Sequence, residues 1–147
     1  MKNFKIVTFT FILVIINGLS GHFLPPLGLI LNPVIIITIS TIIIYGTNMP
    51  AIWKSSLSFV FTVLCDVSIK LYAGGDHDTI GRAIQNLLLF SGVLTSWSTL
   101  LFILIKNKSE KAVYKIIALI LYIVLFIIYF YFFKDLGAGK SYPGYLW

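Results

Sequence analysis

The residues best suited to chemistry in this 147-residue sequence are Asp76, His77 and Asp78, which follow a pair of glycines. Two carboxylates around an imidazole can bind a divalent metal, with His22 completing the set. They can also move protons for a hydrolase or transferase that acts on lipid head groups. A solvated polar turn accounts for the same residues, because Asp caps helices and is common in loops. We therefore predict no metal and no cofactor, and we favour a protein that is not an enzyme.

Asp66 and Lys70 are an acid and a base inside an apolar run. Their spacing of four residues puts them on one helix face, where they can pair. An ionised side chain within the bilayer costs about 2.5–3.5 kcal/mol even on the lenient insertion scale, so both should face the interior of a bundle. Two interpretations stay open: a structural ion pair that locks the bundle, and a pair that works in binding or transport.

Five apolar stretches must position these residues. They span residues 4–20, 27–45, 51–72, 83–105 and 112–133, and each is near the ~17–25 residues that cross ~30 Å of hydrocarbon as a helix. The composition is 59% hydrophobic and 11% charged, whereas soluble domains carry about a quarter charged residues. The stretches do not alternate as barrel strands do. We predict an all-α membrane protein, a single bundle of about five transmembrane helices.

Proline and glycine separate these stretches. Pro25 and Pro26 end the first, Pro50 opens the third, and the glycines at 74 and 75 stop it. Pro33 lies inside the second stretch, so that helix can instead begin near Asn32 and leave residues 27–31 as an interfacial or re-entrant piece. The first stretch also resembles a signal peptide, but we favour an uncleaved anchor.

The distribution of basic residues predicts the orientation. One side of the predicted topology holds seven basic residues and the other holds three: Lys2, Lys5, Lys54, Lys106, Lys108, Lys111 and Lys115 against Arg82, Lys134 and Lys140. The amino terminus is therefore predicted in the cytoplasm and the carboxyl terminus outside. Ten of the eleven basic residues are Lys, which together with abundant Ile, Phe and Asn is typical of an AT-rich bacterial genome and places the chain in a bacterial inner membrane.

On this topology the polar residues gather in the outer leaflet. The intramembrane cluster is predicted to contain Asp66, Lys70, Asn17, Asn32, Gln85 and Asn86, and the outer loops are predicted to contribute His22, Asp76, His77, Asp78 and Arg82. Asp66 lies deepest, roughly 10 Å from the outer end of its helix. Polar residues without a role should not sort by depth, so the sequence predicts a site or a lock at this level.

Three functions fit these observations. The first is an accessory or assembly subunit that acts through helix packing in a membrane complex, since Gly92 and Ser96 have the small-xxx-small spacing of closely packed helices. The second is a small transporter or channel that uses Asp66 and Lys70. The third is an enzyme acting on a lipid-linked substrate at the outer face. The expected partners are the lipid bilayer and other membrane subunits. Nucleic acid is not expected, because the basic residues flank apolar runs.

Overall fold

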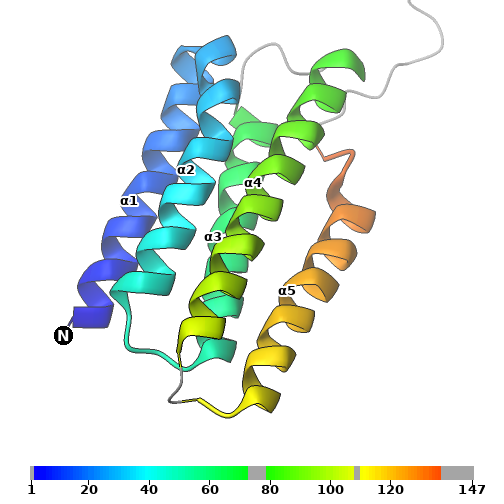
Figure 1. Cartoon of the computed structure of the whole chain (residues 1–147). Coiled ribbons are helices and arrows are strands. Elements are labelled where there is room, and N and C mark those ends of the chain that lie inside the picture. Colours follow the sequence, from blue (N-terminus) through cyan, green and yellow to red (C-terminus); the bar gives the residue numbers. More distant parts are fainter. Residues whose placement is uncertain (1, 73–78, 108–109, 137–147) are drawn as a thin grey trace, which may run out of the picture.

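The computed structural model of the chain describes residues 2–72, 79–107 and 110–136. This part of the chain folds into five α-helices and contains no strand. They are α1 (Lys2–Phe23), α2 (Pro25–Gly46), α3 (Ala51–Tyr72), α4 (Thr79–Lys106) and α5 (Ala112–Phe133) (Figure 1). All five are long enough and apolar enough to cross a membrane, which confirms the predicted all-α class with five such helices.

Large apolar side chains cover the outside of the bundle, and polar side chains lie inside it. Phe9 is 51% exposed and Ile127 is 60% exposed, whereas Asn17, Asp66 and Gln85 are fully buried. A helix in a water-soluble bundle shows the opposite pattern, with its polar face turned outward. The arrangement suits a bundle surrounded by lipid, in which ionisable residues face the interior.

The helices alternate in direction, and α2 and α3 form the centre of the bundle (Figure 1). α2 packs against α1, α3 and α4, and α3 packs against α1, α2 and α5. The flanking helices α4 and α5 touch each other little. An apolar groove of about 340 Å³ lies between them, lined on the α4 side by Phe90 and Trp97 and on the α5 side by Tyr122 and Phe126.

α2 is one continuous helix, although Pro33 lies inside it. The alternative of a helix start near Asn32, with residues 27–31 as a separate re-entrant piece, is therefore wrong. Pro25 and Pro26 fill the first turn, whose N–H groups have no partner within a helix in any case. An internal proline is tolerated in a membrane bundle because packing against neighbouring helices compensates for the lost backbone bond.

Small residues let the helices approach closely. A Cβ atom on Gly28 would lie 2.4 Å from the Cα of Gly21, so α1 and α2 touch backbone to backbone. Gly92 of α4 is buried against Ile36 of α2, and Ser96, one turn further along α4, is also buried. The two residues with small-xxx-small spacing thus face the interior of this bundle rather than its surface.

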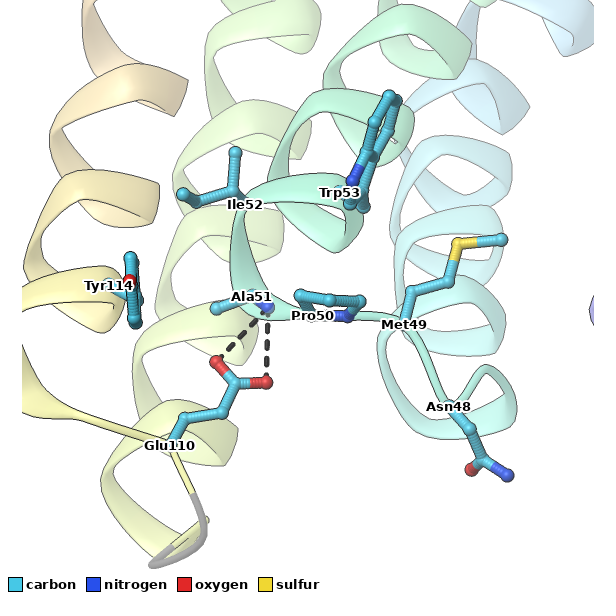
Figure 2. Close-up of a pocket in the computed structure, with 8 residues that line it drawn as sticks. All are labelled: Asn48, Met49, Pro50, Ala51, Ile52, Trp53, Glu110 and Tyr114. Carbon is cyan, nitrogen blue, oxygen red and sulfur yellow. Dashed lines mark hydrogen bonds between the residues drawn. The ribbon is translucent and has the colours of Figure 1, made fainter.

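The N-terminus of α3 is capped by a residue from the α4–α5 connection. Both carboxylate oxygens of Glu110 accept a hydrogen bond from the Ala51 backbone N–H, at 3.1 and 3.2 Å (Figure 2). A negative charge at this position also complements the helix macrodipole. A pocket of about 470 Å³ opens beside the contact, with Pro50, Trp53 and Tyr114 in its lining (Figure 2).

This cap predicts a graded stability effect. Replacing Glu110 with Ala should lower the free energy of unfolding by about 0.5–2 kcal/mol, because the first turn of α3 loses both an acceptor and a charge. Glu110→Gln keeps an acceptor oxygen and should cost less. Thermal unfolding in detergent micelles measures both changes, with the exposed Lys111→Ala as a control. Unfolding of Glu110→Ala at the temperature of the unmodified protein would show that the cap does not stabilise α3.

Candidate functional site

The centre of the candidate site is the ion pair between Asp66 and Lys70 on α3. Lys70 Nζ lies 2.7 Å from Asp66 Oδ2, and the two side chains are 1% and 0% exposed. The same carboxylate oxygen accepts a hydrogen bond of 2.6 Å from the Tyr129 hydroxyl of α5. Gln85 Nε2 of α4 lies 3.4 Å from the other oxygen, Oδ1. Three helices therefore meet at one buried carboxylate.

Lys70 also links α3 to the end of α5. Its ammonium group donates a hydrogen bond of 3.1 Å to the Phe133 backbone carbonyl and lies 5.7 Å from the centre of the Tyr129 ring. Asn86 of α4 reaches the next residue of the chain and donates to the Lys134 carbonyl at 3.2 Å. The last carbonyls of a helix carry partial negative charge and lack partners within the helix. A cation and an amide thus cap α5.

A second group of amides joins α1, α2 and α3. Asn17 Nδ2 donates to Asn32 Oδ1 at 3.0 Å and to the Cys65 carbonyl at 3.2 Å. Asn17 and Asn32 are both fully buried. Within the described residues, the other amide atoms of this pair, Asn17 Oδ1 and Asn32 Nδ2, have no hydrogen-bond partner, and the same holds for Gln85 Oε1. These amides join α1 to α2, and α1 to α3 at the residue before Asp66.

The structure brings Asp66, Lys70 and Gln85 into contact and pairs Asn17 with Asn32 in a second group. Part of the predicted outer-loop site is not described. Asp76, His77 and Asp78 lie outside the described residues. His22 is exposed at the end of α1 and lines an apolar groove of about 540 Å³ with Gly18 and Ser68. Arg82 is partly buried near the start of α4. The described residues contain no group of three or more His, Cys, Asp or Glu side chains that can hold a metal.

Sequence reasoning missed the residues with which α5 holds α3. The two helices run parallel (Figure 1), and three contacts share one sequence offset of 63 residues. These contacts are Ser55 Oγ to the Ala118 carbonyl at 2.6 Å, Tyr129 to Asp66, and Lys70 to the Phe133 carbonyl. The buried positions of α5, at residues 118, 122, 126 and 129, recur every three or four residues, as in a coiled-coil seam. That repeat is the signal that the sequence offered.

The same interface carries a hydroxyl cluster nearer the N-terminal end of α3. Thr62 Oγ1 and the Tyr122 hydroxyl lie 3.4 Å apart. The hydroxyls of Ser40 on α2 and Ser96 on α4 lie next to the Tyr122 hydroxyl. Neither is placed well enough to form a regular hydrogen bond with a described residue. All four side chains are at most 2% exposed. Four helices thus contribute hydroxyls to one point in the apolar core.

The chemistry available at this site is hydrogen bonding, charge pairing and proton transfer. Comparison of the chain with protein families, with curated proteins and with solved structures finds no match. The functional conclusion therefore rests on the geometry of the bundle.

Proposed function

We propose that the chain is a non-enzymatic multi-pass protein of a bacterial plasma membrane that acts through helix packing, as an accessory or assembly subunit of a membrane complex. The observation that carries this proposal is the enclosure of the Asp66–Lys70 pair. Each charge is neutralised by the other and bound by groups from neighbouring helices. A pair without exposure has no contact with a solute. Its hydrogen bonds to α4 and α5 hold these helices against α3.

The proposed orientation has the amino terminus in the cytoplasm. The end of the bundle that contains the start of α1 and of α3 also holds most of the described Lys side chains: Lys5, Lys54, Lys106, Lys111 and Lys115. Lysine flanking transmembrane helices favours the cytoplasmic side. The Asp66–Lys70 pair then lies in the exoplasmic half of the membrane, and the carboxyl terminus lies outside.

The surface proposed for a partner is the outward face of α4. Ser91, Thr95 and Ser98 are exposed there, and each hydroxyl donates to a carbonyl of its own helix, at 2.7–2.9 Å. Such side chains are small and already satisfied, so a second helix can pack closely on them without losing hydrogen bonds. Large residues are exposed on α4 as well, among them Leu87 and Leu94, but the small hydroxyl residues lie between them, whereas the exposed positions along the middle of α5 carry only large aliphatic residues.

Extraction into polymer-bounded nanodiscs, followed by mass measurement, tests this function. The protein should leave the membrane in a particle that contains a second membrane protein in fixed ratio. A Ser91→Leu, Ser98→Leu double variant should release the chain alone, because the added bulk separates the helices. The matched control is Val113→Leu, Val124→Leu on the exposed side of α5. Recovery of the unmodified chain only as an isolated monomer would overturn the assembly proposal.

A second candidate, a small transporter, is favoured by one observation. The buried polar groups of α3 do not end at Asp66 but continue through Thr62 and Ser58 to Ser55, near the opposite end of the helix. The enclosure of Asp66 leaves no room for a solute or a metal ion in this conformation. A proton needs only a chain of hydrogen bonds, so it is the species that this candidate would carry.

A further inference from the structure

One face of α3 carries hydrogen-bonding side chains along its whole length. Ser55, Ser58, Thr62, Asp66 and Lys70 are all buried, with exposures of 0–4%. Their spacings of three and four residues place them on a single helix face. At 1.5 Å per residue, neighbouring members are separated by about 4.5–6 Å along the axis. One water molecule, or one further hydroxyl, is enough to bridge each of these steps.

The hydroxyl cluster supplies further hydroxyls in the middle of this path. Thr62 Oγ1 donates to the Ser58 carbonyl at 2.9 Å and lies 3.4 Å from the Tyr122 hydroxyl. Ser40 and Ser96 adjoin that hydroxyl from the other two helices. Asp66 lies one helical turn beyond Thr62, and its carboxylate accepts a hydrogen bond from the Tyr129 hydroxyl.

Three buried hydroxyls along this path have no hydrogen-bond partner among the described residues, so water is needed to connect them. Ser40 Oγ, Ser58 Oγ and Ser96 Oγ are buried, and no described residue satisfies them. Buried polar atoms in native proteins have partners, and ordered water supplies those that the chain does not. The three orphan hydroxyls lie on α2, α3 and α4 at the level of the hydroxyl cluster and one turn below it.

We propose that these groups form a proton path between the N-terminal end of α3 and Asp66, with the Tyr122 hydroxyl as its central relay. This proposal rests on the second candidate function. Each hydroxyl or water accepts one proton and releases another, so that none changes its net protonation. The Asp66 carboxylate accepts the arriving proton. Lys70, which is 4% exposed near the C-terminal end of α3, then gives one ammonium proton to a water molecule outside the bundle. Its amine recovers a proton from Asp66, so that one proton has crossed and the ion pair is restored.

Proton flux into liposomes that contain the purified full chain tests the path. A potassium gradient with valinomycin drives protons inward, and an enclosed pH-sensitive dye reports them. The unmodified chain should acidify the interior faster than protein-free liposomes. Tyr122→Phe and Thr62→Val should each slow this flux roughly tenfold or more, because each removes a positioned proton-transfer group. Asp66→Asn should abolish it.

Matched controls separate loss of the path from loss of the fold. Tyr131→Phe and Thr38→Val remove the same groups from exposed positions and should leave the flux unchanged. The flux is compared only among variants whose unfolding temperature equals that of the unmodified chain. Flux no faster than in protein-free liposomes, or equal flux in Tyr122→Phe and the unmodified chain, would overturn the proton path. Either result leaves the assembly proposal intact, because the nanodisc experiment reads the mass of the complex and not the flux.

Discussion

Asp66→Ala or Lys70→Ala alone should lower the free energy of unfolding by about 3–5 kcal/mol, because either change leaves one charge buried without its partner. The surviving group stays buried, since both side chains are enclosed. Reversible unfolding in detergent micelles, followed by circular dichroism, measures the loss. An equal loss in both single variants would indicate that the cost comes from the unpaired charge.

Removal of both charges should be far less damaging than removal of one. In the triple variant Asp66→Leu, Lys70→Met, Tyr129→Phe, the ion pair and its hydroxyl donor are replaced by apolar groups of similar size. Such replacements are often neutral or stabilising in other proteins. Recovery of most of the stability is expected, with a remainder from Gln85, whose amide loses its acceptor. A triple variant as unstable as Asp66→Ala would contradict a purely structural lock.

The triple variant also separates the proposed functions. If the pair is a lock, the stable triple variant should still assemble with its partner in nanodiscs. If Asp66 is the proton acceptor of the path, the same variant should assemble but carry no protons. The two readouts are independent, so one protein preparation tests both.

Gly28→Ala is expected to separate α1 from α2. The new Cβ would lie 2.4 Å from the Gly21 Cα and 2.5 Å from its backbone nitrogen. A backbone cannot rotate away as a side chain can, so the helices must move apart. Overpacking of this kind costs about 1–3 kcal/mol, and more when the backbone resists. The change is measured as a lower unfolding temperature in the same detergent.

Gly46→Ala is the matched control for this prediction. Its Cβ would also make a close contact, at 2.9 Å, but with the terminal Cδ1 atom of Ile6, which can change rotamer. The cost should therefore be well below that of Gly28→Ala. If the two variants unfold at the same temperature, the backbone contact between α1 and α2 does not set the distance between them.

The five helices were predictable because lipid imposes a simple rule on the sequence. Each span must be apolar and about 20 residues long, and Pro25, Pro50 and the glycines at 74 and 75 mark the breaks. The helix ends do not coincide with the ends of the apolar stretches: α1 runs on to Phe23, and α4 begins at Thr79, four residues before the apolar stretch that starts at residue 83. Polar residues near a membrane surface can continue a helix as readily as end it, so hydropathy alone does not fix these limits.

The partners of the Asp66–Lys70 pair were only partly predictable. The spacing of the pair, and its place inside an apolar run, follow from the sequence. Tyr122 and Tyr129 lie in an aromatic-rich helix, where tyrosine usually serves as an interfacial anchor. Only the parallel register of α3 and α5 turns their hydroxyls inward. In the same way, nothing in the sequence distinguishes Ser40, Ser58 and Thr62 from the other Ser and Thr residues of the helices. Only the packing of the helices brings their hydroxyls close together.

The most direct test of the account is the distance between Lys70 Nζ and the Asp66 carboxylate in lipid bilayers. Solid-state NMR with nitrogen-labelled Lys and carbon-labelled Asp measures this coupling, and Lys70→Met identifies the signal. We predict a strong coupling that matches the 2.7 Å contact, together with protection of Asp66 from paramagnetic ions in water and from spin labels in lipid. Absence of the coupling, or broadening of the Asp66 signal by lipid spin labels, would place the carboxylate outside the bundle and contradict the account.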